Sequence, residues 1–357
     1  MKISIIGTVG VPANYGGFET LTEQLVNHRT RSDIEYTIYC SSKAYDKRHD
    51  EYNGAKLRYI PLKANGMQSI PYDIVSLIKA SRHSDAILIL GISGCVFLPI
   101  YRLFSKKKLI INIDGLEHRR EKWSAPIRKF LKYSESKAIR HGDIIITDNK
   151  GVSDYVKGEY GVDTNYIAYG GNHVLVDTDE NFTRAIIDKY NLPKEYSLAI
   201  CRIEPENNPH LVLEAFRKSK KNLVFVGNWN RNEYGRGLME KYGKDSNIKL
   251  LDAIYDLKEL SVLRANCHYY LHGHSAGGTN PSLVEVMFFG KPIIAYNVVY
   301  NRETTENKAV YFNTSEQLAE MLTNGVDNAA EIGKNMRETA ERRYTWQTIA
   351  REYEELF

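Results

Sequence analysis

Short apolar runs alternate with stretches of helical pattern along the whole chain, and this alternation limits the folds available to it. The runs are rich in Val, Ile and Leu and contain few polar residues. Strands of this kind are buried on both faces, as in a parallel sheet covered by helices. In the first half, the expected strands are residues 3–6, 34–40, 57–60, 86–90, 109–113, 144–147 and 165–168. The sequence therefore predicts an α/β protein built on doubly wound parallel sheets.

The pattern restarts in the second half of the chain. Residues 174–195 have no strand-like run and predict a connector, after which strands are expected at 197–201, 222–226, 248–251, 267–271 and 292–296. A chain of 357 residues also exceeds one typical domain. We expect an N-terminal domain over residues 1–173 and a C-terminal domain over 174–344. The final helix, 345–357, is expected to brace against the N-terminal domain.

A glycine-rich loop at residues 273–280 follows one of the C-terminal strands. Pro281 and Ser282 then open a helix that carries Glu285 about one turn inside. Free backbone N–H groups and the positive end of a helix dipole suit an anion such as phosphate. The Glu285 carboxylate is placed to accept hydrogen bonds from ribose hydroxyls. The segment predicts a nucleotide site, with Glu285 as an ordinary surface glutamate being the alternative.

A second glycine loop, GTVGVPANYGGFET at residues 7–20, follows the first strand. It lacks GxGxxG, and the second strand does not end in an acidic residue, which argues against a nicotinamide or flavin oxidoreductase. Gly16 and Gly17 instead precede a helix and would let a ligand approach the backbone closely. The alternative is an ordinary β–α turn. Two such loops, one in each half, predict a ligand held by both domains.

Positive charge is concentrated in the first half of the chain. Residues 1–173 have a net charge of +7, and residues 102–140 alone hold 12 basic and 4 acidic side chains. The helix expected from Trp123 to Arg140 is basic and amphipathic, which is typical of contact with an anionic membrane surface. The alternative is a helix whose apolar stripe packs on the sheet. No aromatic-interleaved motif accompanies the charge, so we expect no nucleic-acid partner.

Membrane-spanning segments, disulfides and metal sites are not expected. The apolar run 86–104 is interrupted by glycine and proline, and the four cysteines stand far apart, as buried thiols do in a reducing cytoplasm. His272 and His274 have no third ligand nearby, which argues against a metal site. We interpret Asp177-Thr178-Asp179 as solvated polar residues of the connector rather than as a metal motif. We expect neither a metal nor a cofactor.

Several segments together resemble one known family. They are the N-terminal loop, DGLEHRREKW at 114–123, CRIEPENN at 201–208, GHSAGGTNPSLVEVM at 273–287 and the C-terminal YTWQTIAREYEELF. The chain resembles retaining GT-B glycosyltransferases of family 4, in a subgroup of rhamnosyltransferases of capsule and O-antigen synthesis with a DUF1972-like N-terminal domain. The resemblance implies two Rossmann-like domains facing a cleft and metal-independent transfer.

The resemblance assigns roles to the turn after the first C-terminal strand. Arg202 matches the arginine that neutralises the pyrophosphate leaving group, a role that suits a planar, charged fork. Asn207 stands where the family usually has a lysine, so one fixed positive charge is missing there. Gly16 and Gly17 would approach the donor diphosphate or the donor sugar.

The family's paired glutamates are only half present. Glu285 matches the second, which binds the ribose, while the first falls on Gly277. The missing carboxylate suggests a donor sugar with a different set of hydroxyl groups, such as a 6-deoxy sugar. The implied phosphate and sugar contacts are the backbone of Gly277 and Gly278 together with Thr279 and Asn280.

The segment after the strand 109–113 supplies the remaining candidates. Asp114 nearly holds the place of a family histidine that touches the donor sugar, and His118 follows four residues later. Asp114 and Glu117 are candidates to accept or orient the proton of the acceptor hydroxyl. The alternatives are a loop carboxylate that caps a turn and a solvated loop histidine.

The resemblance implies transfer of L-rhamnose from dTDP-rhamnose, with retention, onto a lipid-pyrophosphate-linked saccharide of a bacterial surface polysaccharide. The protein would be cytoplasmic and peripheral on the inner face of the membrane through residues 119–140. A UDP-sugar or GDP-sugar donor, a GT-B sugar-nucleotide epimerase and a non-catalytic glycan- or nucleotide-binding protein remain alternatives.

Overall fold

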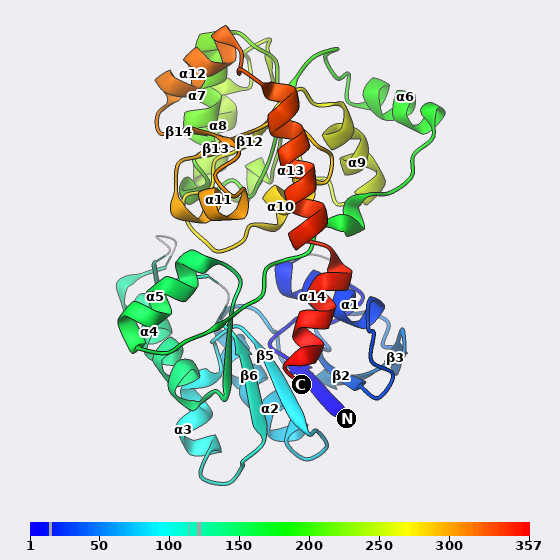
Figure 1. Cartoon of the computed structure of the whole chain (residues 1–357), viewed down its shortest axis with the longest axis vertical. Helices are drawn as coiled ribbons and strands as arrows, with labels where there is room; N and C mark the ends of the chain where they lie inside the picture. Colours follow the sequence, from blue (N-terminus) through cyan, green and yellow to red (C-terminus); the bar gives the residue numbers. More distant parts are fainter. Residues whose placement is uncertain (14–15, 114, 120–122) are drawn as a thin grey trace. The chain divides into compact units, whose positions relative to one another are not determined.

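The computed structural model describes residues 1–13, 16–113, 115–119 and 123–357 and divides the chain into two compact units (Figure 1). The N-terminal unit comprises Met1–Tyr169 and Trp346–Phe357, and the C-terminal unit comprises Gly170–Thr345. Each unit is a parallel sheet covered by helices. The predicted fold class, two doubly wound α/β domains, is confirmed.

The N-terminal unit is built on a sheet with the strand order β3-β4-β2-β1-β5-β6-β7-β8. Among the described strands, only the β3–β4 pair is antiparallel. All five residues of β5 are buried, as expected for a strand covered on both faces. The strands are β1 Lys2–Ile6, β2 Glu35–Ser41, β3 Glu51–Tyr52, β4 Ala55–Ile60, β5 Ala86–Leu90, β6 Lys108–Asn112, β7 Ile144–Thr147 and β8 Asn165–Tyr166.

Helices of the N-terminal unit include the last helix of the chain. The carboxylate of Glu354 on α14 accepts the N–H groups of Thr30 (2.9 Å) and Arg31 (3.2 Å). These hydrogen bonds join α14 to the loop that follows α1. The Tyr353 hydroxyl accepts a hydrogen bond from Asn112 at 2.6 Å. The helices are α1 Gly17–Asn27, η1 Gly66–Gln68, α2 Ser69–Ala80, η2 Cys95–Phe97, α3 Leu98–Tyr101, η3 Glu117–Arg119, α4 Ala125–His141, α5 Lys150–Tyr160 and α14 Trp346–Glu355.

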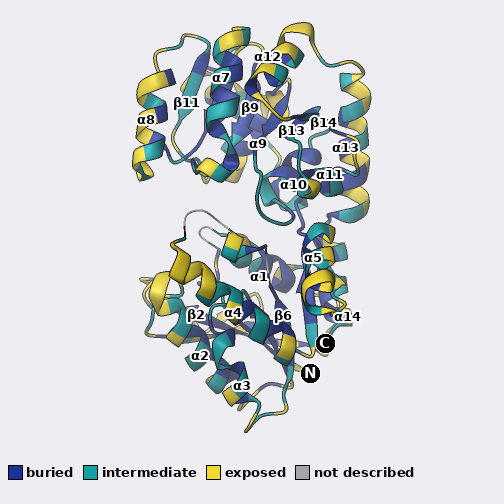
Figure 2. Cartoon of the chain, turned by 90° about the vertical axis from the view of Figure 1, so that its left-hand side faces the viewer, coloured by how far each residue is buried: buried dark blue, intermediate teal, exposed yellow. Residues whose placement is uncertain are grey.

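The C-terminal unit has a wholly parallel sheet with the order β11-β10-β9-β12-β13-β14. Figure 2 shows how buried residues concentrate along its strands. The strands are β9 Ser197–Ile200, β10 Leu223–Val226, β11 Ile248–Leu251, β12 Tyr270–His272, β13 Ile293–Tyr296 and β14 Val310–Phe312. The strand expected at 267–271 starts later because Cys267 ends the preceding helix.

The helices of this unit are η4 Asn172–Val174, α6 Glu180–Lys189, η5 Pro205–Asn207, α7 Pro209–Ser219, η6 Trp229–Arg231, α8 Glu233–Tyr242, α9 Leu257–Asn266, α10 Pro281–Met287, α11 Val299–Thr304, α12 Ser315–Asn324 and α13 Ala329–Arg343. Helix α6 corrects the expectation of a plain connector at 174–195. Asp179 is its N-cap and accepts the N–H of Phe182 at 2.7 Å, so this aspartate is a capping residue.

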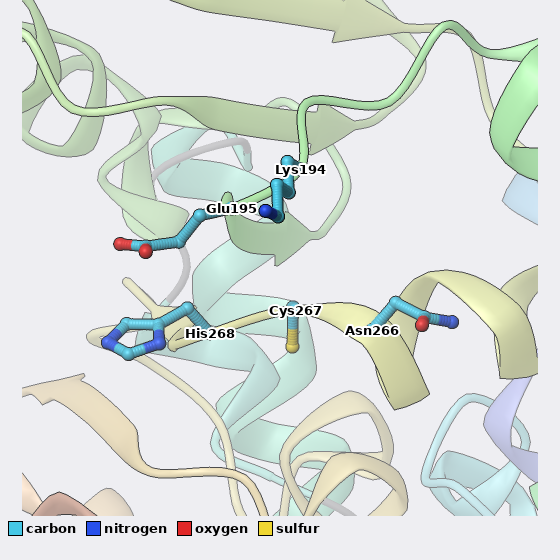
Figure 3. Close-up of a pocket in the computed structure, with 5 residues that line it drawn as sticks. All are labelled: Lys194, Glu195, Asn266, Cys267 and His268. Carbon is cyan, nitrogen blue, oxygen red and sulfur yellow. The ribbon is translucent and has the colours of Figure 1, made fainter.

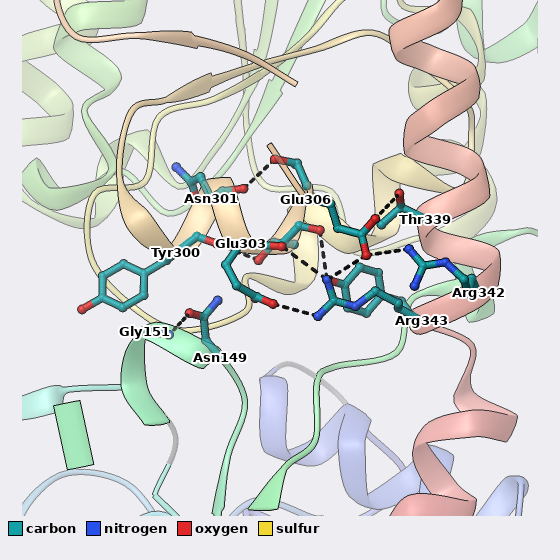
Figure 4. A network of polar contacts seen from close by, with 12 residues as sticks. Asn149, Gly151, Tyr300, Asn301, Glu303, Glu306, Thr339, Arg342 and Arg343 are labelled. Atoms are coloured by element: carbon teal, nitrogen blue, oxygen red, sulfur yellow. Dashed lines mark hydrogen bonds and ion pairs between the residues drawn. The ribbon is translucent and has the colours of Figure 1, made fainter. Parts of the chain in front are cut away.

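An ion-pair network joins the end of α11 to the end of α13 (Figure 4). Arg343 lies 2.8 Å from Glu303 and 3.3 Å from Glu306, and Arg342 lies 2.5 Å from Glu306. Burial alone would raise the pKa of Glu306. The hydrogen bonds that its carboxylate accepts from Arg342 and Lys308 outweigh burial and lower the pKa to about 2. The network fixes the last turn of α13 at the point where the chain leaves the C-terminal unit.

The cysteines are free thiols. Within the described ranges, no helix is both long and apolar enough to span a bilayer.

Candidate functional site

The sheet of the C-terminal unit brings two distant segments together at one edge. The turn 201–208 follows β9 and the loop 273–280 follows β12, and these two strands are parallel neighbours. The Asn208 amide donates to the Gly273 carbonyl at 3.0 Å, and Ser275 donates its N–H and hydroxyl to the Glu206 carbonyl at 2.9 and 2.8 Å. A Cβ on Gly273 would lie 2.4 Å from the Asn207 carbonyl oxygen, so glycine is required for this approach.

Arg202 and Asn207 occupy the two ends of that turn and differ in exposure. Arg202 is exposed, whereas Asn207 is 5% exposed. The Asn207 amide donates to the Arg202 carbonyl oxygen at 2.7 Å. Asn207 therefore holds the backbone that carries Arg202, whose side chain is exposed.

The predicted phosphate loop leads into the short helix α10. Gly277 has φ +123°, a conformation that favours glycine, and its Cβ position faces open space. Thr279 is buried. The carbonyl of Asn280, the N-cap, accepts the N–H groups of Leu283 (3.0 Å) and Val284 (3.1 Å). In the described structure the Asn280 side chain does not cap the helix, so it does not compete for the N–H groups of the first turn.

Glu285 is paired with a residue that the sequence analysis did not identify. Its Oε2 forms an ion pair with Arg264 in the last turn of α9, and its Oε1 lies 3.7 Å from Nε2 of His173. The Arg264 side chain is 2% exposed and that of Glu285 is 16% exposed. Burial raises the pKa of Glu285, and the Arg264 guanidinium opposes this shift. An arginine within the apolar pattern of α9 was the available signal.

His272 and His274 stack at the end of β12, with ring centroids 4.3 Å apart and planes at 10°. His272 is 1% exposed, and burial lowers its pKa to about 3, so the ring is neutral at physiological pH. Across the described ranges, no set of three or more His, Cys, Asp or Glu side chains is arranged to bind a metal.

In the N-terminal unit, the glycine loop is arranged around a buried carboxylate. Glu19 in the first turn of α1 accepts the Val9 N–H at 2.7 Å and the Thr8 hydroxyl at 3.1 Å. Gly16 has φ +139°, and a Cβ there would lie 1.8 Å from Glu19 Oε2. The Gly17 carbonyl accepts the hydroxyl of Tyr169 at 2.6 Å. A carboxylate at this helix start disfavours phosphate and favours neutral hydroxyl groups.

The candidates after β6 fall in different surroundings. Asp114 lies outside the described residues. The Glu117 carboxylate accepts the indole N–H of Trp123 at 3.0 Å. His118 Nδ1 lies 2.9 Å from Oε2 of Glu135, whose side chain is 2% exposed. Glu117 and His118 are thus each held by a side chain that the sequence analysis did not assign.

Glu135 also accepts the hydroxyl groups of Tyr155 (2.8 Å) and Tyr160 (2.7 Å). Burial raises the pKa of Glu135, but its hydrogen bonds with His118 and Tyr160 outweigh burial and hold the pKa below its usual range. The carboxylate therefore stays charged and fixes the turn 117–119 against α4 and α5.

One open pocket of about 480 Å³ lies elsewhere in the C-terminal unit and is lined by Lys194, Glu195, Asn266, Cys267 and His268 (Figure 3). These residues precede β9 and β12, so the pocket is at the amino ends of the strands. Ligands of parallel α/β sheets bind at the carboxyl ends. The pocket is therefore separate from the predicted site.

Sequence comparison identifies two domains. Residues 1–172 match a domain of unknown function, DUF1972, and residues 181–345 match the family described as Glycosyl transferases group 1. No curated protein sequence matches the chain.

Solved structures resemble the chain over almost its whole length. Sucrose-phosphate synthase from Thermosynechococcus elongatus has a TM-score of 0.81 at 16% identity, covering 99% of this chain and 98% of that one. HepE of Anabaena, solved with UDP-glucose, has a TM-score of 0.75 at 15% identity over 99% and 98%. The N-terminal domain of trehalose-6-phosphate phosphatase from Candida albicans has a TM-score of 0.73 at 11% identity over 99% and 96%. The fold is GT-B, and with the group 1 domain it supports a GT-B glycosyltransferase.

Proposed function

We propose that the chain is a retaining, metal-independent glycosyltransferase of family 4 that uses a nucleoside-diphosphate sugar. The observation that carries this proposal is the connection between the turn 201–208 and the loop 273–280. The turn that carries the exposed Arg202 is hydrogen-bonded to this glycine-rich loop, and the helix after the loop carries Glu285, which supports a common donor site.

In this proposal, each part of the site has one task. Arg202 stabilises the charge that develops on the departing diphosphate, an effect of about 3 kcal/mol for a preorganised donor. Gly277, Gly278, Thr279 and Asn280 contact the phosphates and the sugar. Glu285 accepts a hydroxyl of the nucleoside sugar.

The N-terminal unit takes the acceptor in this proposal. Gly16 and Gly17 remain the candidates to approach the donor, and the Glu19 carboxylate beside Gly16 favours contact with the donor sugar over the diphosphate. Asp114, Glu117 and His118 remain the candidates to receive or orient the acceptor proton, and Glu135 keeps His118 in place.

For the donor we propose dTDP-L-rhamnose. Gly277 supplies no carboxylate at the position where the wider family binds sugar hydroxyls, which suits a 6-deoxy sugar. A UDP-sugar is the second candidate, because the structurally similar HepE was solved with UDP-glucose.

For the acceptor we propose a lipid-pyrophosphate-linked saccharide at an anionic membrane surface. The apolar side chains of Ile100, Leu103 and Phe104 are 55%, 84% and 60% exposed. Within residues 100–107 and 127–141, Glu135 is the only acidic side chain, and it is buried. Exposed apolar groups among cations suit anionic lipid headgroups. This surface extends the one expected at residues 119–140.

The test is incubation with dTDP-, UDP- and GDP-sugars, with and without a lipid-pyrophosphate-glucose acceptor. A transferase releases nucleoside diphosphate only when the acceptor is present, and the acceptor gains one sugar. Release without acceptor would support the epimerase instead. Absence of diphosphate release with every donor would contradict the transferase.

A further inference from the structure

Arg264 is a buried cation with few partners. Its Nη2 pairs with Glu285 Oε2, and its side chain is 2% exposed. Its Nε and Nη1 atoms are also buried, and neither has a hydrogen-bond acceptor among the residues that the structure describes. A buried guanidinium that loses its counter-ion is strongly destabilising. Glu285 Oε2 therefore stays with Arg264 when a ligand binds.

This pairing uses part of the acceptor capacity of Oε2, so Oε1 is the better hydrogen-bond acceptor for a ligand. Glu285 Oε1 is the remaining oxygen, and it lies 3.7 Å from Nε2 of His173. A ribose presents two neighbouring hydroxyls, 2′ and 3′, which match the two oxygens of a free carboxylate. A 2′-deoxyribose presents only the 3′-hydroxyl on that side. Because Oε2 already accepts from Arg264, we expect Glu285 to accept a hydrogen bond from one ribose hydroxyl more readily than from two.

We propose that the Arg264–Glu285 pair selects 2′-deoxyribonucleoside diphosphates over their ribonucleoside counterparts. The proposal rests on the proposed function, since it assumes that Glu285 meets the nucleoside sugar. With the 3′-hydroxyl on Oε1, a ribose 2′-hydroxyl would lose its water on binding and meet Oε2, whose charge is already shared with Arg264, which costs affinity. The pair would thus make Arg264 a specificity-determining residue of the donor site.

The experiment measures dissociation constants of the full chain for UDP, dUDP, ribothymidine diphosphate and dTDP by titration calorimetry. UDP and dUDP differ only in the 2′-hydroxyl, and so do ribothymidine diphosphate and dTDP, so the 5-methyl group is controlled. We expect the deoxy form to bind about tenfold more tightly in each pair, the effect of one lost hydrogen bond.

Variants connect that preference to Arg264. In Arg264→Met, both oxygens of Glu285 are released, so the deoxy preference should fall to about onefold, mainly through tighter binding of the ribonucleotides. The Arg264→Met variant leaves Glu285 without its cation, so Arg264→Lys serves as a second variant that keeps the charge but loses the planar guanidinium. Its deoxy preference should lie between those of the wild type and Arg264→Met. Arg217→Met is the matched control, since Arg217 pairs with Asp245 on other elements of the same unit.

The outcomes separate the two proposals. If none of the four diphosphates binds, the dTDP and UDP donors proposed above are contradicted and this inference falls with them. If all four bind with equal affinity, or if the deoxy preference is the same in wild type, Arg264→Met and Arg264→Lys, only the inference is overturned.

Discussion

The Asn208 amide donates to the carbonyl oxygen of Gly273 at 3.0 Å, although 65 positions separate the two residues in the chain. The contact fixes the turn after β9 against the loop after β12. The turn that carries Arg202 and the predicted phosphate loop are therefore hydrogen-bonded to each other before any ligand binds. Such preorganisation is what a site needs in order to stabilise charge in a transition state.

Gly273→Ala tests this edge. The added Cβ would lie 2.4 Å from the Asn207 carbonyl oxygen, so the turn must move away from the loop. We expect a loss of about 1–3 kcal/mol in stability, as for other overpacked sites, and a higher KM for the donor. The control is Gly237→Ala, because a Cβ at Gly237 meets no atom within 4 Å. Equal donor KM values for the two variants would contradict the prediction.

Arg202→Ala tests the leaving-group role. We expect kcat to fall by about two orders of magnitude, the effect of removing one preorganised charge contact. Thermal stability should stay within about 0.5 kcal/mol because the side chain is exposed. Arg236→Ala removes another exposed arginine of the same unit and should keep full activity. An unchanged kcat in Arg202→Ala would remove this residue from the mechanism.

The alternation of apolar runs and helical patterns was enough to predict most strands of both sheets, because buried parallel strands leave a local signal in the sequence. The short strands β3 and β14 were not predicted. It was also enough to place Glu285 inside a helix after a glycine loop. The partners of these residues were not predictable. Arg264 on α9 meets Glu285 on α10 only in the folded chain, and Glu135 meets His118 through the packing of α4 on the turn before it. Neither contact leaves a local pattern.

Helix α6 was missed for a different reason. Its sequence, ENFTRAIIDK, contains few apolar residues, so the segment was interpreted as a polar connector although Phe182 and Ile186 stand at helical spacing. The useful signal was the cap: Asp179 followed three residues later by Phe182, whose N–H it accepts. Treating that aspartate as a solvated connector residue concealed a helix start.

Glu306→Gln tests the network between α11 and α13 by its pH dependence. The pKa of Glu306 is lowered to about 2 in the folded protein, so this carboxylate stabilises the fold above its unfolded pKa of about 4.3. That stabilisation is lost progressively as the pH falls from about 4.3 to about 2. At pH 7 we expect the variant to be less stable by about 1–2 kcal/mol, a value reduced for partial solvent exposure.

The measurement is the thermal midpoint of wild type and Glu306→Gln between pH 7 and pH 2.5. The difference between them should be largest near neutrality and should shrink with acid. Glu338→Gln is the control, because the exposed pair of Glu338 with Lys334 spans 3.7 Å. A constant difference across the pH range would contradict the network's role.

The surface of Ile100, Leu103 and Phe104 can be tested by vesicle sedimentation. Helix α3 packs against α4, and Arg102 donates to the His141 carbonyl at 2.6 Å, so α3 lies at the C-terminal end of α4, whose last turns carry Lys137 and Arg140. We expect the wild type to bind vesicles containing anionic lipid, and Leu103→Ser with Phe104→Ser to weaken binding by about tenfold through lost apolar burial. Raising the salt concentration should weaken the remaining binding, since the cations are screened.

Met67→Ser is the matched control for that experiment, because Met67 is 92% exposed but lies outside this surface. It should bind anionic vesicles like the wild type. Neutral vesicles should retain much less of either protein, because each cation near an anionic surface contributes about 1 kcal/mol. Equal sedimentation with neutral and anionic vesicles would contradict the electrostatic part of the argument. Equal binding by the wild type and the Leu103/Phe104 variant would contradict the apolar part.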